Sequence, residues 1–295
     1  MTASPSIESP NRTVEHGAGS RRTPRLRGPR LAIAGGGTGG HVLPGVHLLD
    51  AAFEANLALE DVVWFSSGRP IEERAFAPLQ SRLAARAADG FALGFERVAL
   101  ALEPQGGGAP ARLALGVRAL PAIARARAEL VRHRSEVVLG LGGFTSLPVV
   151  LAARTLGLPV ALLEINARAG TATRWLGRFA QRVFHAWPST MPRGARHDRS
   201  DAGGRHVRSG PPLAAEFARG PVDDGARALA KQALGLDPQR PLLAILGGSQ
   251  GAGGLNRFVR EVAAARWSAA GIEGVHPTGP NKLSEGAAGI PRYRA

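Results

Sequence analysis

The sequence predicts an α/β protein made of two doubly wound parallel-sheet halves, the second of them incomplete. Short apolar runs alternate with segments of helical periodicity from residue 30 to about residue 187, the order expected of parallel strands with helices on both faces. Two of these runs end in glycine-rich turns, and a strand, glycine loop and helix recur after a polar stretch. A chain of 295 residues with 44% hydrophobic residues is long enough to form two domains.

The first domain is expected to span residues 30–187. It follows a disordered basic arm at residues 1–29, which is rich in proline, serine and arginine and lacks the apolar core of a secretory signal. The predicted strands are 31–34, 61–65, one within 91–100, 137–139, 158–163 and 182–185. The predicted helices are 44–56, one that begins near 68, 111–134, 149–155 and one that ends near 180.

The first predicted strand runs into six small residues and a histidine at positions 35–41. Glycines let the backbone approach a ligand closely, and the N–H groups at the start of the next helix can bind phosphate. The pattern G-x-G-x-x-G through Gly35, Gly37 and Gly40 makes a nicotinamide-binding domain an alternative. That alternative expects a carboxylate at the end of the second strand, where the sequence has Ser66-Ser67-Gly68, and it is therefore disfavoured.

A second small-residue turn, 140–143, follows the strand 137–139, and Glu164-Ile165-Asn166 follows the next strand. The carboxyl ends of parallel strands meet at one edge of a sheet, which is where ligands bind in such folds. The two glycine turns are therefore expected to line one crevice and to share one diphosphate.

Composition excludes several classes of function. The chain has no cysteine, which rules out disulfides, thiolate catalysis and cysteine metal sites, and its eight histidines are scattered, so no metal and no cofactor are expected. The formal charge is +14, but aromatic residues make up only 5% and do not alternate with basic residues, so no nucleic acid partner is expected. No run of about 18 uncharged apolar residues exists that would predict a transmembrane helix.

Residues 111–134 carry six arginines and a single acidic residue, Glu129, between apolar residues at helical spacing. A basic amphipathic helix of this kind can lie on an anionic membrane surface. The alternative is an ordinary helix that packs its apolar face on the sheet, with Pro121 kinking or splitting it.

Four motifs occur in a fixed order across about residues 30–280, and together they resemble the MurG family of N-acetylglucosaminyltransferases, which make lipid II in peptidoglycan synthesis. The motifs are Gly36-Gly-Thr-Gly-Gly-His41 with Pro44, Gly140-Leu-Gly-Gly-Phe-Thr-Ser-Leu-Pro148, Glu164-Ile-Asn166 with Gly170, and Gly247-Gly-Ser-Gln-Gly-Ala252 with Asn256. The resemblance implies a GT-B type fold of two Rossmann-like halves. It also implies inverting transfer of GlcNAc from UDP-GlcNAc to the MurNAc 4-hydroxyl of lipid I, the undecaprenyl-diphosphate-linked acceptor.

By the same resemblance His41 is the general base, and the enzyme is peripheral on the cytoplasmic side of an anionic inner-membrane surface. An imidazole titrates near neutral pH, and a helix N-terminus favours its neutral form. The alternative is that His41 only caps or orients the loop. The implied donor-binding residues are Thr38, Gly39, Gly40, Asn166 and Ser249. The implied acceptor diphosphate-binding residues are Gly37, Gly40, Gly142, Gly143 and Phe144.

The remaining chain is interpreted as a linker at 188–222, a partial donor-binding domain at 223–280 and an irregular tail at 281–295. Gly210 and Leu213 stand where the family usually has an asparagine and an arginine that contacts the donor. A Rossmann-like half needs roughly 120 to 150 residues, and far fewer follow the linker. Little or no transferase activity is therefore expected, and a non-catalytic relative that binds a lipid diphosphate is an alternative.

Overall fold

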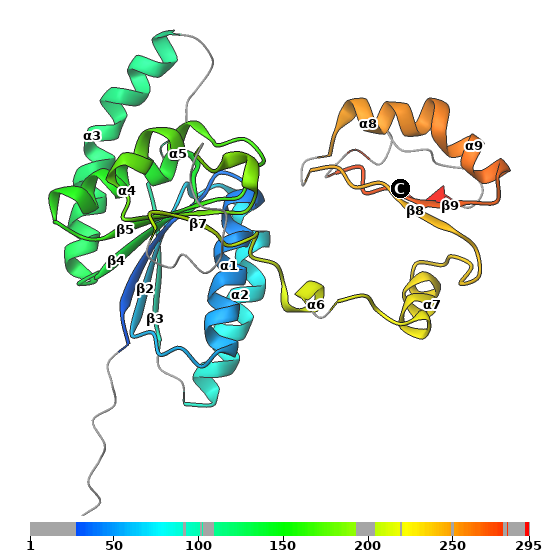
Figure 1. Ribbon diagram of the computed structural model, residues 1–295, viewed down its shortest axis with the longest axis horizontal. Helices are drawn as coiled ribbons and strands as arrows, with labels where there is room; N and C mark the ends of the chain where they lie inside the picture. Colours follow the sequence, from blue (N-terminus) through cyan, green and yellow to red (C-terminus); the bar gives the residue numbers. More distant parts are fainter. Residues whose placement is uncertain are drawn as a thin grey trace, which may run out of the picture.

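A computed structural model shows two domains joined by a single connection through the short helix α6, Ala215–Ala218 (Figure 1). It describes residues 28–90, 93–100, 102, 109–192, 204–218, 220–248, 251–279, 282 and 293–294. The expected disordered arm therefore lies almost entirely outside the described residues.

The first domain contains a seven-stranded, wholly parallel sheet with the strand order β3-β2-β1-β4-β5-β6-β7. The strands are β1 Arg30–Ala34, β2 Asp61–Ser66, β3 Gly94–Ala99, β4 Val137–Gly140, β5 Val160–Glu164, β6 Arg182–His185 and β7 His206–Arg208. The helices are α1 Gly39–Glu54, α2 Pro70–Ala88, α3 Ala109–Arg132, α4 Gly143–Thr155 and α5 Thr171–Leu176, with 3₁₀ turns at Gly177–Phe179 and Pro188–Thr190. The predicted parallel α/β sheet is confirmed.

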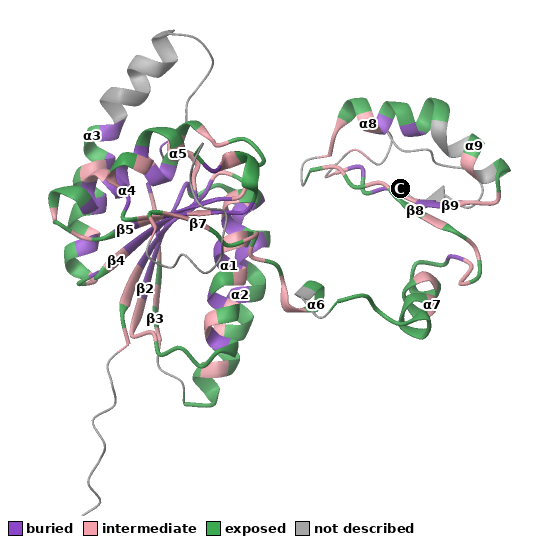
Figure 2. Cartoon of the chain, in the orientation of Figure 1, coloured by how far each residue is buried: buried purple, intermediate pink, exposed green. Residues whose placement is uncertain are grey.

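Both faces of this sheet are covered. Alternate side chains of the central strands point to opposite faces, so Ile33 and Trp64 pack with α1 and α2 while Ala34 and Phe65 pack with α3 and α4. Figure 2 shows the buried residues concentrated in these central strands and in the helix faces that contact them. Strands that are buried on both sides are expected to be almost wholly apolar, and Val62–Phe65 in β2 is such a run.

Strand β1 is the point at which the strand order reverses, because β2 lies on one side of it and β4 on the other. Ala34, the last residue of β1, is paired with Gly140, the last residue of β4. The turns that follow these two strands therefore lie next to each other at the topological switch point, where ligands bind in open α/β sheets.

Two boundaries differ from the prediction, and for one reason. Helices α1 and α4 begin at Gly39 and Gly143, five or six residues before the predicted starts at 44 and 149. The predictions began where apolar residues start to recur at helical spacing, which is at or just after Pro44 and Pro148. The structure instead has both prolines inside the helix, preceded by a glycine-rich first turn.

Three further differences concern single segments. Helix α3 runs without interruption through Pro121, so this proline does not split it. Residues 206–208 fall in the expected linker but form β7 against β6, so the linker interpretation is wrong for them. Residues 293–294 form β10, Tyr293–Arg294, paired with β9, so the expected irregular tail is wrong at this point.

The second domain is small and has a parallel three-stranded sheet in the order β10-β9-β8. Its strands and helices are α7 Asp224–Ala233, β8 Leu242–Ala244, α8 Gly253–Phe258, a π-helical segment Val259–Ala263, α9 Ala264–Ala269 and β9 Glu273–Val275. Its described hydrophobic cluster is centred on Val259, with Ile245, Leu255 and Trp267 partly buried around it. The predicted strand, glycine loop and helix are therefore present, with far less buried apolar surface than in the first domain.

Candidate functional site

The two N-terminal glycine turns meet at the carboxyl edge of the first sheet, as predicted. The first turn leads from β1 into α1, and the second leads from β4 into α4. The two helix N-termini therefore lie at the same edge. The first N–H groups of a helix have no intrahelical partner and carry partial positive charge, so they suit an anion.

The His41 side chain lies between these turns. Gly142 has a positive φ of 92°, and a Cβ placed on it would lie 3.3 Å from Cδ2 of His41, so the ring packs directly on this backbone. Nδ1 of His41 lies 3.2 Å from the Thr38 hydroxyl. Burial lowers the pKa of His41, although the negative charge of Glu164 opposes the shift. The imidazole is therefore neutral near pH 7 and can accept a proton.

The carboxylate of Glu164, at the end of β5, ties the third predicted motif to the same edge. It accepts hydrogen bonds from the Asn166 backbone N–H at 3.0 Å, the Asn166 side-chain amide at 2.9 Å and the Gly170 N–H at 2.8 Å. Burial alone would raise the pKa of Glu164, but hydrogen bonds from Thr173, Asn166 and Gly170 hold it below its ordinary value. Glu164 is thus a buried anion that fixes the loop containing Asn166.

The backbone N–H groups that are predicted to bind phosphate divide into two groups. The Gly37 N–H is hydrogen-bonded to the Glu72 carboxylate, and the Gly142 N–H donates to the Ser146 hydroxyl at 3.0 Å. These two N–H groups already have acceptors within the chain. Gly39, Gly40, Gly143 and Phe144 stand instead in the first turns of α1 and α4, where backbone N–H groups face the common edge.

Sequence reasoning missed the role of Glu72. This carboxylate is fully buried and accepts hydrogen bonds from Gly37 N, Ser67 N, Ser67 Oγ and Gly68 N. It therefore holds the first glycine turn against the loop after β2. A signal was present: Glu72 is the third residue of α2, a position from which glutamate commonly bonds the backbone before a helix. The disfavoured nicotinamide alternative gains nothing from this carboxylate, because its oxygens are engaged by the protein itself.

An apolar pocket of about 310 Å³ adjoins the second glycine turn. Its lining comes from the start of α4 and from α5, and consists of Gly143, Phe144, Leu147, Thr171, Ala172 and Trp175. The side chains of Phe144 and Trp175 are 47% and 62% exposed, which is unusual for large aromatic residues. Arg178 of the following 3₁₀ turn lies over the Trp175 ring.

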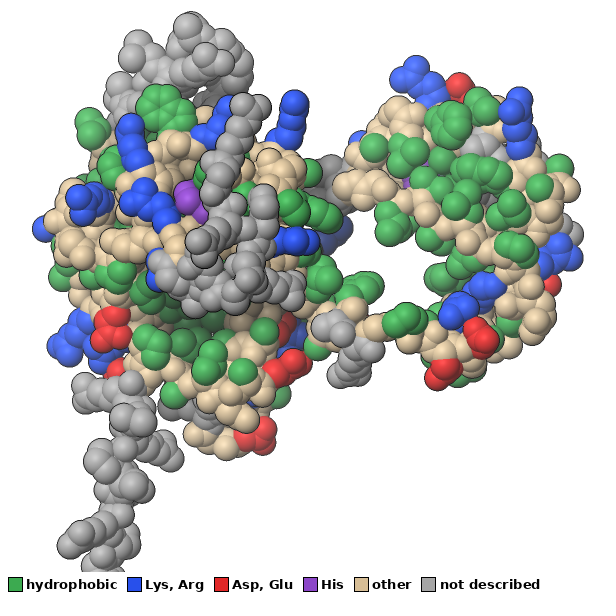
Figure 3. Space-filling view, in the orientation of Figure 1, with side chains coloured by type: hydrophobic (Ala, Val, Ile, Leu, Met, Phe, Trp, Pro, Cys, Tyr) green, Lys and Arg blue, Asp and Glu red, His purple; other side chains and the backbone are tan. Residues whose placement is uncertain are grey.

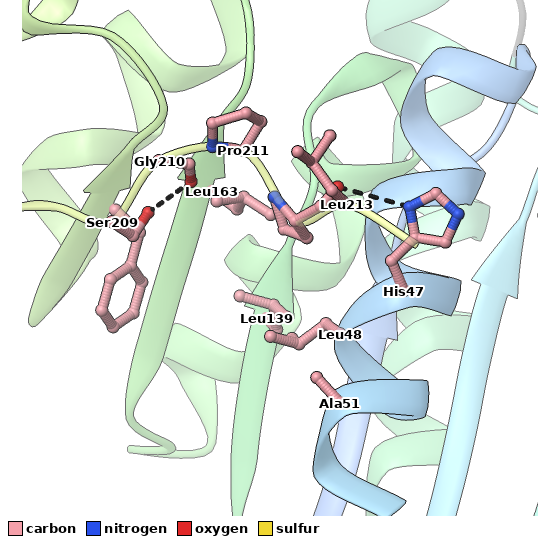
Figure 4. A pocket seen from close by; sticks show the side chains of 11 residues that line it. His47, Leu48, Ala51, Leu139, Leu163, Ser209, Gly210, Pro211 and Leu213 are labelled. Carbon is pink, nitrogen blue, oxygen red and sulfur yellow. Dashed lines mark hydrogen bonds between the residues drawn. The ribbon is translucent and has the colours of Figure 1, made fainter. Parts of the chain in front are cut away.

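A second apolar pocket, of about 340 Å³, lies on the other face of the sheet beside α1 (Figure 4). The side chains of Leu48 and Leu139 point toward each other in it, and residues 209–213 cross over it. Nδ1 of His47 lies 3.3 Å from the Pro212 carbonyl oxygen and anchors this crossing segment to α1. Leu213, which replaces the arginine of the resembling family, is part of this apolar lining.

In the second domain the predicted donor residue Ser249 lies outside the described residues. Asn256 of the fourth motif is buried, and its side-chain amide donates to the Thr278 carbonyl oxygen at 3.0 Å. Asn256 therefore links α8 to the segment after β9. None of the described helices is long and apolar enough to cross a bilayer.

Comparison with solved structures defines the class of fold. The chain matches the crystal structure of MurG from Acinetobacter baumannii with a TM-score of 0.54 and 20% identity, over 90% of this chain and 65% of that one. It matches UDP-GlcNAc 2-epimerase from Neisseria meningitidis, bound to UDP-GlcNAc, with a TM-score of 0.54 and 11% identity, over 90% of this chain and 71% of that one. The chain is thus an α/β protein of the GT-B type, as predicted.

Sequence comparison defines the family. The model of the glycosyltransferase family 28 N-terminal domain matches residues 31–185, which contain β1 to β6 and both glycine turns. The chain belongs to glycosyltransferase family 28.

Curated relatives carry the name UDP-N-acetylglucosamine–N-acetylmuramyl-(pentapeptide) pyrophosphoryl-undecaprenol N-acetylglucosamine transferase. The relative from Frankia casuarinae is 34% identical over 261 residues, which are 88% of this chain and 62% of the relative. The relative from Synechococcus sp. (strain JA-3-3Ab) is 35% identical over 281 residues, 94% of this chain and 66% of the relative. The predicted resemblance to the MurG family is confirmed, and the chain spans somewhat under two thirds of these relatives.

Proposed function

We propose that this protein acts in inverting transfer of GlcNAc from UDP-GlcNAc to the MurNAc 4-hydroxyl of undecaprenyl-diphosphate-MurNAc-pentapeptide. The observation that carries the proposal is the position of His41, a neutral imidazole packed between two glycine turns at the switch point of the sheet. The names of the relatives suggest the substrates, and the geometry supports His41 as the base and the two helix N-termini as an anion site.

In this proposal the acceptor hydroxyl attacks C1 of the GlcNAc residue from the side opposite the nucleotide. The new C1–oxygen bond forms as the bond from C1 to the UDP oxygen breaks, and UDP leaves with the bonding electron pair. With its Nδ1 proton directed to the Thr38 hydroxyl, His41 accepts the hydroxyl proton on Nε2. Glu164 stabilises the imidazolium that results, because its charge favours the protonated ring.

The acceptor diphosphate is assigned to the N-termini of α1 and α4. Gly39, Gly40, Gly143 and Phe144 offer backbone N–H groups there, and two helix dipoles favour the negative charge. Asn166 is assigned to the donor side of the same edge, held in place by Glu164. Donor binding through Thr38 and Ser249 remains part of the same proposal.

We also propose that the protein contacts the anionic inner membrane from the cytoplasmic side, through Phe144, Trp175 and Arg178. Their pocket adjoins the proposed diphosphate site, so a lipid-linked acceptor held there has its apolar chain close to two exposed aromatic rings. The alternative docking element, α3, is less suitable over its described half. Ala122, Ala126 and Leu130 of α3 are buried against the sheet domain.

The proposal is tested by following radiolabelled GlcNAc transfer from UDP-GlcNAc to lipid I with the 295-residue chain. General bases contribute about 10²- to 10⁴-fold to such reactions, so His41→Ala should lower the rate at least about 100-fold while acceptor binding stays nearly intact. His47→Ala, the same change two turns further along α1, is the matched control and should retain the rate. Because burial lowers the pKa of His41, the acid limb of the pH–rate profile should lie below the ordinary histidine value of about 6.5.

Two outcomes would contradict the proposal. If His41→Ala transferred GlcNAc as fast as the His47→Ala control, His41 would only orient the loop. If the unaltered chain bound lipid I but transferred no GlcNAc, the alternative of a non-catalytic relative that binds a lipid diphosphate would hold instead.

A further inference from the structure

Three potential metal ligands converge on the far side of the first domain, toward the amino ends of its strands. They are Glu96 in β3, Glu129 in the last turn of α3 and His133 directly after that helix. One ligand atom from each lies within 4.8 Å of the others. No metal was expected from the sequence because its eight histidines are scattered along the chain.

The histidine distinguishes this cluster from an ordinary group of surface carboxylates. The side chain of His133 is only 9% exposed, and its Nε2 atom is buried without a hydrogen-bond partner among the described residues. That nitrogen lies 3.4 Å from Oε2 of Glu96. Two ligands on one tetrahedral Zn²⁺ at bond lengths of about 2.0 Å are separated by about 3.3 Å, so the spacing fits a shared ion.

The other ring nitrogen is held by a carboxylate. Nδ1 of His133 lies 2.6 Å from Oδ2 of Asp61, the first residue of β2. A carboxylate behind one ring nitrogen is the arrangement found at metal-binding histidines, where it fixes the ring and leaves the other nitrogen toward the ion. Asp61 therefore fixes the ring with Nε2 on the side of Glu96.

Arg132 is the cation now present in the cluster. It donates to Oε1 of Glu96 and to Oε2 of Glu129, both at 2.6 Å. Each of these bonds uses one carboxylate oxygen, and the other oxygen of Glu96, Oε2, lies on the side of His133. Both glutamates are at least partly exposed, so their side chains can close around an ion that enters from solvent.

We propose that Glu96, Glu129 and His133 form a site for a first-row divalent cation of the Zn²⁺ type, with Asp61 as the residue that orients His133. A mixed imidazole and carboxylate ligand set favours such an ion over Mg²⁺ or Ca²⁺, which prefer oxygen ligands alone. The site ties β2, β3 and the end of α3 together, at the edge of the sheet opposite the glycine turns. It is independent of the proposed transfer reaction.

Isothermal titration of the full chain with ZnCl₂ in a non-chelating buffer tests the site, and Co²⁺ absorption reports the ligand geometry. Removing an orienting carboxylate typically weakens a metal site about 10- to 100-fold, so Asp61→Asn should weaken Zn²⁺ binding by that factor and Glu96→Gln by more. Arg132→Gln removes a competing positive charge and should tighten binding about fivefold. His47→Asn, which removes a histidine elsewhere, should leave the affinity unchanged.

Glu96→Gln is the decisive variant because Glu96 is exposed, and its loss leaves the fold intact even if His133 variants fail to fold. Equal Zn²⁺ affinity of Glu96→Gln and the unaltered chain would overturn the proposal. Loss of binding in His47→Asn would also overturn it, since the ion would then sit at another histidine.

Discussion

Glu72 and Glu164 are buried carboxylates that hold the loops around His41. Glu72 joins the first glycine turn to the loop after β2, and Glu164 joins the end of β5 to the loop with Asn166. Both accept hydrogen bonds from backbone N–H groups, which offsets the cost of burying a charge. The side chain of His41 contacts the Thr38 hydroxyl, and its position also depends on the loops that these two carboxylates hold.

Replacing Glu72 by glutamine should destabilise the first domain. A glutamine amide turns one acceptor into a donor that faces N–H groups of Gly37, Ser67 or Gly68, so buried donors lose their partner. The expected loss is about 2–4 kcal/mol in the free energy of unfolding, measured by urea denaturation. The neighbouring Glu73→Gln is the matched control. Glu73 pairs with Arg97 at the surface, so its change should stay below about 1 kcal/mol. Equal losses of stability in the two variants would contradict the role of Glu72 in holding the first glycine turn against the loop after β2.

Gly142 tests the contact between the backbone and the ring of His41, the proposed base. Gly142→Ala should lower the free energy of unfolding by about 1–3 kcal/mol, because φ 92° and ψ −168° lie in a region essentially restricted to glycine, and its new methyl group would press on the His41 ring. Gly157→Ala is the control, since Gly157 also has a positive φ but nothing lies within 4 Å of its added Cβ. We expect a loss of stability in both variants, larger in Gly142→Ala, and a loss of GlcNAc transfer of at least about tenfold in Gly142→Ala alone. If both lost transfer equally, strain rather than the ring contact would be responsible.

At the scale of helices and strands, apolar periodicity predicted the order of the elements well, because buried parallel strands are short apolar runs. Helix starts were predicted less well. The first turn of helix α1 begins with Gly39 and Gly40 and that of helix α4 with Gly143, and glycine has no side chain that could reveal a periodicity. Those same turns carry the backbone N–H groups of the proposed site, so the functional part of each helix was the part least visible in its pattern.

The candidate site was predictable where it depends on local sequence. His41 and the two glycine turns lie within continuous motifs, and parallel topology alone brings the turns together. Strand β7 and the Asp61–His133 contact depend instead on residues 23 to 72 positions apart, which no periodicity connects. The sequence therefore predicted the two neighbouring glycine turns but not the contacts between distant elements.

Strands β6 and β7 are joined by a histidine pair that predicts a pH-dependent stability. Nε2 of His185 lies 2.9 Å from Nδ1 of His206. Burial, with the charge of the partner histidine, lowers the pKa of His185, and burial with nearby Arg205 lowers that of His206. Both folded pKa values lie below the unfolded value of about 6.5, so the pair contributes stability that is complete above pH 6.5 and is lost as pH falls through the folded values.

The urea concentration at the midpoint of unfolding should therefore decrease when the pH is lowered from 7.5 to 5.5. The decrease should be smaller in His206→Gln, which has one titrating group fewer. His41 also contributes to the slope in both proteins, so the difference between them isolates the pair. If the urea midpoint changed with pH equally in the unaltered chain and in His206→Gln, the pH dependence would come from other groups.

At the scale of the molecule, burial is uneven between the two domains. The first domain has two large apolar clusters, one on each face of its sheet, whereas the described cluster of the second domain is centred on the single residue Val259. Leu229 and Leu246 of the second domain remain 67% and 75% exposed. Apolar burial is the main favourable contribution to folding, so stability measurements on this chain should report chiefly on the first domain.

Charge is also unevenly distributed over the first domain. On the face drawn in Figure 3, the described carboxylate side chains of this domain lie in its lower part, whereas its upper part, around α5, shows arginine side chains. Arg174 and Arg178 belong to α5 and the turn after it, next to the exposed ring of Trp175. This end of the domain thus combines exposed aromatic rings with positive charge, which suits an anionic lipid surface.

Trp175→Ala should therefore weaken binding of the full chain to vesicles that contain anionic lipid. Burial of a large apolar side chain contributes about 1.5–3 kcal/mol, so the expected loss is between about tenfold and 100-fold in a vesicle cosedimentation assay. Trp187→Ala is the matched control. Trp187 is also exposed at 47%, but its indole N–H is bonded to the Ile165 carbonyl oxygen and it does not line the pocket between α4 and α5. Raising the salt concentration should weaken binding of both the unaltered chain and the control, because arginines near an anionic surface contribute about 1 kcal/mol each. Equal losses in the two tryptophan variants, or binding that ignores salt, would show that this end of the domain is not the membrane contact.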